Sequence, residues 1–466
     1  MEPMRGITGL GGGAASLGLH SADSGVYADL SGADHMFVLN GTYEEYGGLG
    51  NVMTPSFDEG SAIVYVAGVL NGGTESETFV AKLNLSGSGE ILWQANYGDG
   101  AQYGEHCDIG FDKDGDLYVC GSSDTYGNLL MKLDKSNGDI TWQRELDTDL
   151  GPYRGVWNSM SFLPSDWGGH IYVGGACSGG GGGAAVLAKY NQSGTLLWQR
   201  NLGPQNDSAG WVGVYVDGNS KCHCVGYIKN NDGYKAAFAQ YNWNGSLDAQ
   251  KGSNDNGVFM GGIAHDSPTP WGHGGGGTFW FSGTNTSRRG IGKYASALSS
   301  YSGRLMDHTV GDCAYSRSED SSDSTDRLIM MGRLSSYYWG RLDQDNSGTG
   351  GTVLAASWDK QITDTSDSQN VYWSQVKCKG HYAYAAGIGA GSNTGNLLIY
   401  AFDASTGGTN DTYGGTYVVK GGDNSSGSGG FGAGNQSFGD NTPTFTDYAG
   451  GASKSSASQS LTKQTT

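Results

Sequence analysis

Two runs of oxygen-bearing side chains have a spacing that suggests metal chemistry. They are Asp112, Asp114 and Asp116, and further on Asp343, Asp345 and Ser347 ahead of Gly348. This spacing resembles the first half of a calcium loop, but neither run contains the Glu that completes an EF-hand. Both runs stand where a tight turn is expected, and Asp is favoured in turns because its carboxylate bonds to nearby backbone groups. We expect plain turns at both places, keep calcium binding as the alternative, and assign no metal-binding residue.

Groups that could catalyse a reaction do not gather into a motif. The sequence has no Gly-x-Ser-x-Gly elbow, no His-Glu-x-x-His and no phosphate-cradling loop with Lys-Ser or Lys-Thr. The nine histidines are scattered: His20, His35, His106, His170, His223, His265, His273, His308 and His381. A glycosidase or a quinone-dependent dehydrogenase would need paired carboxylates or a cofactor platform. That enzyme is an alternative; our prediction is a protein with no enzymatic activity, no catalytic or cofactor-binding residue and no cofactor.

Cysteines and tryptophans suggest two other kinds of site. The seven cysteines are Cys107, Cys120, Cys177, Cys222, Cys224, Cys313 and Cys378. Their odd number and irregular spacing argue against a disulfide framework, and Cys222-x-Cys224 has no second pair to complete a zinc site. Four tryptophans in connecting segments could stack on sugars or belong to the core: Trp157, Trp167, Trp211 and Trp271. The ligand-binding residues of the chain are therefore left unassigned.

Composition and charge exclude several classes of protein. The chain has 466 residues, of which 83 are Gly, and its formal net charge is −19. A nucleic-acid partner is not expected, because phosphate neutralisation needs clustered Lys and Arg. No apolar stretch approaches the length that spans a bilayer, so no membrane partner is expected. The acidic second residue and the lack of a clean apolar segment at the start argue against a secretory signal.

A repeated unit must position all of these residues. A short apolar segment that ends in Gly recurs as "VYVAG" (64–68), "LYVCG" (117–121), "IYVGG" (171–175), "CHCVG" (222–226), "FWFSG" (279–283), "LIMMG" (328–332) and "AYAAG" (383–387). These segments mark seven units of about 53 residues, a period typical of propeller blades, and before most of them comes another strand that ends in Asp and a turn. After each comes a strand such as "FVAKLN" (79–84), and after the first three comes a Trp-Gln strand with Trp93, Trp142 or Trp198. The fifth to seventh units have no clear Trp-Gln strand.

Four strands a unit, joined by Gly and Asp turns, predict an all-β fold. A four-stranded antiparallel unit cannot bury both of its faces alone, but units packed in a ring can. We therefore predict a seven-bladed β-propeller of four-stranded antiparallel blades over residues 50–420, with Gly/Ser-rich terminal extensions. The three tryptophans are expected to cover the apolar gap between neighbouring blades.

The ends of the chain differ from the repeats. Residues 1–26 are Gly-rich, and we interpret them as an N-terminal attachment segment. Residues 27–49 contain "HMFVLNG" (35–41), which is expected to close the ring by pairing with the last blade. Residues 421–466 form a low-complexity C-terminal tail, which buries too little apolar area to be ordered unless a partner surface holds it.

Three stretches give a resemblance to a known repeat. They are "GPQNDSAGWVGVYVDGNSKCHCVGY" (203–227), "FVAKLNLSGSGEILWQANYG" (79–98) and "VLAKYNQSGTLLWQRNLG" (186–203). They resemble the seven-bladed β-propeller repeat of bacterial surface proteins and of structural proteins of tailed phages. The start "RGITGLGGGAASLGL" (5–19) is similar to that of marine phage virion proteins, including tail and tail-fibre components.

The resemblance implies a non-enzymatic virion structural protein of a tailed phage. It would be a tail, tail-fibre or capsid-decoration component, made in the host cytoplasm and located in the virion. Its expected partners are other virion structural proteins, contacted through the termini in an oligomeric assembly, with a host surface glycan as a further partner. The alternative is a glycan- or receptor-binding propeller of a bacterial surface protein.

Overall fold

The described part of the chain is built from strands. The computed structural model describes residue 30 and, from residue 34 on, the strands named below with the turns at 56–62, 85–89, 112, 114–116, 134–139, 169–170, 191–195, 217, 219–221 and 242–246. Every regular element in this part is a β-strand. Among these residues there is no helix that could cross a membrane.

Consecutive strands form four-stranded antiparallel units, here called blades. Blade 1 consists of β2 (Asn51–Pro55), β3 (Ile63–Asn71), β4 (Ser76–Asn84) and β5 (Glu90–Gly98), and blade 2 of β6 (Cys107–Phe111), β7 (Leu117–Ser123), β8 (Gly127–Leu133) and β9 (Ile140–Asp147). Blade 3 consists of β10 (Gly155–Phe162), β11 (Ile171–Gly179), β12 (Gly182–Tyr190) and β13 (Leu196–Leu202), and blade 4 of β14 (Ala209–Val216), β15 (Cys222–Asn230), β16 (Gly233–Tyr241) and β17 (Leu247–Ser253). The Trp-Gln segments of the sequence are the outer strands β5, β9 and β13.

The remaining units follow the same plan. Blade 5 consists of β18 (Phe259–His265), β19 (Thr278–Thr284), β20 (Arg289–Ala295) and β21 (Tyr301–Met306), and blade 6 of β22 (Thr309–Ser316), β23 (Arg327–Arg333), β24 (Tyr337–Asp343) and β25 (Ala355–Asp364). Blade 7 consists of β26 (Tyr372–Lys379), β27 (Tyr382–Ser392), β28 (Thr394–Asp403) and β1 (His35–Glu44). The fourth strands of blades 5 and 6, which the sequence did not reveal, are β21 and β25, and that of blade 7 is β1, which contains the segment 35–41.

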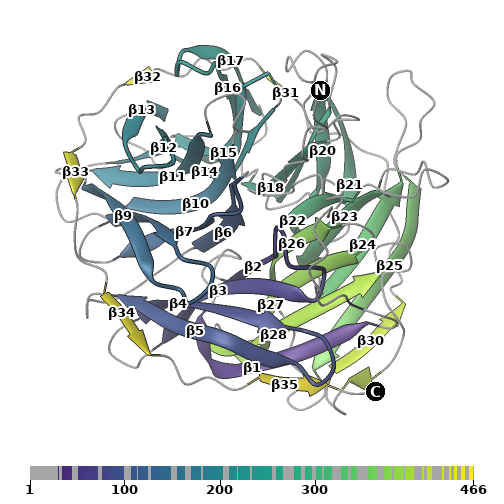
Figure 1. Ribbon diagram of the computed structural model, residues 1–466. Coiled ribbons are helices and arrows are strands. Elements are labelled where there is room, and N and C mark those ends of the chain that lie inside the picture. The colour runs from purple at the N-terminus through teal and green to yellow at the C-terminus, as the bar shows by residue number, and fades with distance from the viewer. Residues whose placement is uncertain are drawn as a thin grey trace, which may run out of the picture.

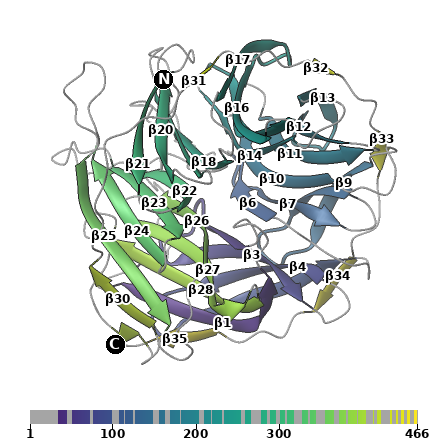
Figure 2. The ribbon, with the colours of Figure 1, turned by 180° about the vertical axis from the view of Figure 1, so that it is seen from behind.

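The blades stand in a closed ring, which Figure 1 shows face on. The first strand of each blade is the inner strand and contacts the inner strand of the next blade, and β26 contacts β2 to close the circle. Figure 2 shows the same ring from behind. The described strands therefore form a β-propeller, and the predicted all-β class is confirmed.

In blades 7 and 1 to 4, whose core side chains are described, the core lies between neighbouring blades because their second strands are largely apolar on both sides. In β3, Val64 and Val66 pack towards blade 7, in a cluster with Tyr384 and Ile399. Tyr65 and its neighbour Ala67 pack towards blade 2. Alternate residues of one strand thus supply two cores, as expected for a strand buried on both faces. Equivalent clusters join blade 2 to blade 3 and blade 3 to blade 4.

The N-terminal strand closes the ring. In β1, Met36 lies opposite Tyr400 and Leu39 lies opposite Leu397 in the antiparallel pair with β28. This is the pairing expected for residues 35–41. Farther along, Tyr43 is paired with Leu70 of β3 as well, so β1 also joins blade 7 to blade 1.

The C-terminal tail departs from expectation. After β29 (Thr412–Tyr413), β30 (Tyr417–Gly421) pairs with the outer strand of blade 6. The next five strands, here called the belt, are β31 (Ala433–Gly434), β32 (Asp440–Asn441), β33 (Thr446–Tyr448), β34 (Ser453–Ser456) and β35 (Leu461–Gln464). They pair with the outer strands of blades 4, 3, 2, 1 and 7, in that order.

The belt therefore lies on the rim of the ring, as the yellow strands of Figure 1 show. The expectation that only a partner surface could order residues 421–466 is wrong for these strands. The expectation failed because the outer strand of a blade has a row of backbone N–H and C=O groups that the blade itself leaves unpaired. Hydrogen bonding to those groups can order a segment that has little apolar area of its own.

Candidate functional site

The turns after the first and third strands of a blade lie at the same end of the blade, because consecutive strands are antiparallel. In blades 1 to 4 these turns span residues 56–62 and 85–89, 112–116 and 134–139, 169–170 and 191–195, and 217–221 and 242–246, counting the described residues. We call this end of the ring the turn face. Most of the polar residues that the sequence singles out, and that the structure describes, lie on or under it.

A repeated hydrogen bond joins the outer strands of blades 1 to 3 to the turn face of the next blade. The indole Nε1–H of the outer-strand tryptophan donates to a carbonyl oxygen 3.0 Å away: Trp93 to Lys135, Trp142 to Gln192 and Trp198 to Trp243. Each indole also packs against the central Tyr of its own second strand, with ring centroids 5.7–6.0 Å apart. The predicted packing role of these tryptophans between blades is confirmed, and we call this contact the Trp clamp.

Glycine makes the Trp clamp possible. Gly138, Gly194 and Gly245 have φ angles of 78°, 77° and 81° and lie directly against the three indoles. A Cβ atom would come within 2.7 Å of the Trp93 ring at Gly138 and within 2.8 Å of the Trp198 ring at Gly245. Both the left-handed backbone and the lack of space therefore require glycine.

Arginine adds a second bond to two of these clamps. The Nε–H of Arg144 donates to the Gly194 carbonyl and that of Arg200 to the Gly245 carbonyl, each at 2.7 Å. Both guanidinium groups also lie over the indole two residues earlier in the same strand. In blade 1 the Tyr97 hydroxyl makes the corresponding bond to Gly138. Each turn is thus held at two backbone carbonyls that lie two or three residues apart.

Lysines of the third strands place positive charge under the turn face. Lys82 lies 2.6 Å from the carboxylate of Glu59, and Lys132 lies 2.5 Å from that of Asp116. For Lys189 the partner that the structure describes is a carbonyl: its ammonium donates to that of Trp243 at 2.9 Å. Burial lowers the pKa of Lys189 to about 8. The Lys of "VLAKYN" is therefore a structural cation that joins blade 3 to blade 4.

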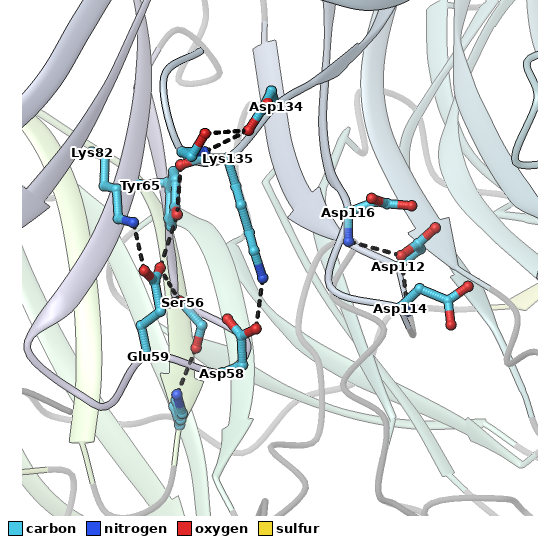
Figure 3. Close-up of polar contacts among 12 residues, drawn as sticks. Ser56, Asp58, Glu59, Tyr65, Lys82, Asp112, Asp114, Asp116, Asp134 and Lys135 are labelled. Carbon is cyan, nitrogen blue, oxygen red and sulfur yellow. Dashed lines mark hydrogen bonds and ion pairs between the residues drawn. The ribbon is translucent and has the colours of Figure 1, made fainter. Parts of the chain in front are cut away.

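Glu59 is the centre of the polar network in blade 1, shown in Figure 3. Its carboxylate accepts hydrogen bonds from Ser56, Tyr65 and Lys82 at 2.6–3.0 Å. Burial acts to raise the pKa of Glu59, but the Lys82 charge and the three hydrogen bonds outweigh it and lower this pKa. All of these partners belong to blade 1, so the network joins the first turn of this blade to its second and third strands.

The alternating carboxylates of blade 2 form a capped turn. Asp112 accepts the backbone N–H groups of Asp114 and Asp116 at 3.0 Å each. Its other oxygen accepts the Tyr118 hydroxyl at 3.0 Å and the Gln192 amide at 2.8 Å. Burial raises the pKa of Asp112 despite these bonds. The turn predicted at Asp112–Asp116 is therefore present, and its carboxylates are engaged with protein groups.

The second alternating run lies mostly beyond what the structure describes. Asp343 is the last residue of β24, whereas Asp345, Ser347 and Gly348 lie outside the described residues. In the described part of the chain, no three His, Cys, Asp or Glu side chains are grouped so that they could hold a metal ion.

Blade 4 contains a buried Asp–His pair that the sequence did not single out. Asp217 caps its turn as Asp112 does, accepting the N–H groups of Asn219 and Lys221 at 2.9 Å each. Its other oxygen lies 3.1 Å from Nε2 of His223. His223 occupies the position that is Tyr118 in blade 2, so the alignment of the repeats carries the signal for this pair. Burial lowers the pKa of His223, and Asp217 offsets that effect only in part.

A second buried pair lies among the inner strands. Asp108 of β6 and Lys377 of β26 are both fully buried, and the ammonium lies 3.2 Å from a carboxylate oxygen. Asp108 also accepts the Gln375 amide at 3.1 Å and the backbone N–H of Met160 at 2.8 Å. One carboxylate thus joins blades 7, 2 and 3. The two partners are 269 residues apart in the sequence, where nothing indicates that they meet.

Of the four tryptophans proposed for sugar stacking, the structure describes one side chain. Trp211 is fully buried in the core between blades 3 and 4, so the sugar-stacking alternative is wrong for this residue. The side chain of Trp157 and all of Trp167 and Trp271 lie outside the described residues. Trp243, which is 64% exposed, was not among the four tryptophans proposed for sugar stacking.

Histidines and cysteines do not assemble into a common site in the described part. His35 is in β1, His170 precedes β11 and His223 is in β15, on three different blades. The four cysteines whose side chains are described are buried free thiols: Cys120, Cys222, Cys224 and Cys378. The remaining histidine and cysteine side chains lie outside the described residues.

Comparison with known proteins gives structural similarity alone. No protein-family model and no curated protein matches the chain. Sqt1 from Chaetomium thermophilum is 10% identical, with 79% of this chain and 100% of that chain covered at a TM-score of 0.38. The β-propeller domain of Nup133 from Vanderwaltozyma polyspora is also 10% identical, with 80% and 99% covered at a TM-score of 0.37. A subtype N10 neuraminidase-like protein is 9% identical, with 64% and 93% covered at a TM-score of 0.31.

The class of the protein follows from its own strand pairing. It is an all-β propeller, and the described polar residues of its turn face mainly join one blade to the next or cap a turn.

Proposed function

We propose that this chain is a non-enzymatic structural protein of a tailed-phage virion, with the propeller as a rigid interaction module. The observation that carries the proposal is the use of the polar side chains of blades 1 to 3. Trp clamps, arginines and turn-capping carboxylates all bond within the molecule. Residues used in this way stabilise one shape, which suits a building block better than a catalyst.

The virion assignment rests on the resemblance of residues 5–19 and 203–227 to phage structural proteins. In this proposal the module is a tail, tail-fibre or capsid-decoration component, and its partners are other virion proteins. It is made in the host cytoplasm and incorporated into the particle.

Particle composition tests the assignment. Gradient-purified virions from the phage that encodes this chain should contain it in a fixed ratio to the major capsid protein, measured by mass spectrometry. Antibody-gold labelling should place it at one location on the particle. Its presence in infected cells together with its absence from purified particles would contradict the proposal.

Lack of turnover is tested on the purified protein. Incubation with a panel of polysaccharides and with quinone-dependent dehydrogenase substrates should give no product above the rate of a heat-denatured control. Release of reducing sugar, or reduction of an electron acceptor, would favour the enzyme alternative instead.

Glycan binding is a second candidate function, because of Trp243. This side chain is 64% exposed on the turn face, while its backbone carbonyl is held by Trp198 and Lys189. The Lys189 ammonium lies 5.9 Å from the centre of the Trp243 ring. An exposed indole ring has a broad apolar face and one polar edge, and such a face can stack on a sugar ring.

A glycan array with host surface polysaccharides tests this candidate. Binding by the native protein should be lost in Trp243→Ala and kept in Leu197→Ala, a matched change at an apolar residue that is 44% exposed. Equal binding by both variants, or none by the native protein, would remove the glycan function.

A further inference from the structure

The belt shows that outer strands of this propeller accept an added strand. Each of β5, β9, β13, β17 and β1 pairs with its own blade on one side and with a belt strand on the other. The longest of these pairings are those of β34 with β5 and of β35 with β1, of four residues each. One blade after another thus presents the same kind of binding edge to one continuous segment.

The belt is suited to backbone recognition. Tyr448 and Leu461 are the only large apolar residues at its paired positions. The others are polar or charged, or small like Ala433, Gly434 and Ser453. Such side chains offer little apolar area, so main-chain hydrogen bonds must supply most of the affinity. This is strand addition, in which an extended peptide extends a sheet at its edge.

The belt is also attached by several short strands, each of which binds weakly by itself. Its strands have two to four residues, and two of them form only two residue pairs with their blade. A pairing this short is marginal by itself, so the belt is held by the sum of its strands. Such a segment can leave one blade at a time.

We propose that the outer edges of blades 1, 2, 3, 4 and 7 form a strand-acceptor site, and that in an assembly this site takes the belt of a second copy of the chain. A second copy carries the same sequence and makes the same backbone pairs. Covalent linkage favours the chain's own belt only through effective concentration, and crowding of copies in an assembly reduces that advantage. The second-copy step rests on the proposed function, because it requires many copies side by side.

A cut made after folding tests the site on the intact ring. A protease recognition sequence is placed within residues 422–432, between β30 and β31, and the protein is cleaved after purification. The cleaved belt should remain with the ring in size-exclusion chromatography. A fluorescent synthetic peptide of residues 433–466 should then replace it, seen as a rise in anisotropy.

Peptide variants show whether backbone pairing is the cause. The Pro peptide carries Lys454→Pro, Ser455→Pro, Thr462→Pro and Lys463→Pro, and the matched control carries Ala at the same four positions. Neighbouring residues of a strand point their N–H groups to opposite sides, so each adjacent pair loses one bond to the ring. We expect the Pro peptide to bind at least about tenfold more weakly than the Ala peptide. Equal binding of the two peptides, or no binding of the native peptide, would overturn the site.

Native mass spectrometry tests the second-copy step. A mixture of cleaved rings, freed of their belts, with uncleaved full-length chains should contain complexes of one ring with one full-length chain. Their absence, or a cleaved belt that never exchanges, would overturn this step. Virions that lack the chain while the peptide binds would refute the proposed function and leave the acceptor site standing.

Discussion

At the Trp clamp, one added Cβ atom decides whether a residue other than glycine fits. Gly245 combines a φ of 81° with a site where a Cβ atom would lie 2.8 Å from the Trp198 ring. Gly87 has a similar φ of 60°, but nothing lies within 4 Å of its Cβ position. The two residues therefore separate the backbone cost of losing glycine from the cost of a clash.

Gly245→Ala should lower the free energy of unfolding more than Gly87→Ala does. Both variants incur about 1–2 kcal/mol for the left-handed backbone, and overpacking against Trp198 adds about 1–3 kcal/mol at Gly245 alone. Urea unfolding followed by tryptophan fluorescence measures the difference. Equal losses in the two variants would show that the indole moves aside freely.

The buried pair in blade 4 predicts a pH dependence of stability. Burial holds the pKa of His223 below its ordinary value of 6.5, so the unfolded chain binds this proton more readily than the folded chain. The stability that a neutral His223 contributes is therefore complete above pH 6.5 and decreases as the pH falls below it. Asp217, whose pKa is lowered by its hydrogen bonds against the effect of burial, loses its own contribution only at more acidic pH, below its ordinary pKa.

His223→Tyr should reduce the loss of stability between pH 7 and pH 5. Tyr is the residue at this position in blades 1 to 3, and it does not titrate in this range. The native protein should lose up to about 1.4 kcal/mol more per pH unit than the variant. Urea midpoints at several pH values provide the measurement. A variant with the same pH profile as the native protein would exclude His223 as the source.

At the scale of elements, the Trp clamp joins one outer strand to one turn. Trp142→Phe removes the Nε1–H donor to Gln192, and we expect the free energy of unfolding to fall by about 1 kcal/mol. Trp243→Phe should leave it unchanged, because Trp243 contributes its backbone carbonyl to the clamp and its ring is largely exposed. Thermal unfolding by circular dichroism compares the two. A similar effect of both changes would argue against the hydrogen bond.

Elements were predictable where sequence and local physics agree. The apolar second strands, the Lys-bearing third strands and the turn at Asp112–Asp116 all follow from patterns within one unit. The belt was not predictable, because its mostly small or polar residues carry no apolar pattern and its order depends on edges formed elsewhere. The burial of Trp211 was not predictable for a related reason. The sequence around a tryptophan near a loop is the same whether or not a neighbouring blade covers its side chain.

At the scale of the whole molecule, the Asp108–Lys377 pair joins three blades. Removing one partner leaves the other charge buried without compensation, which costs about 3–5 kcal/mol. Lys377→Met and Asp108→Asn should each destabilise the ring by this amount, and the double variant by clearly less than their sum. A double-mutant cycle on urea unfolding measures the coupling. Additive losses would mean that the two groups do not interact.

The first and last described strands of the chain lie side by side on blade 7, with Met36 opposite Gln464. The two strands therefore depend on each other's place in blade 7: a change that frees β1 would undo the closure of the ring and release the last strand of the belt together.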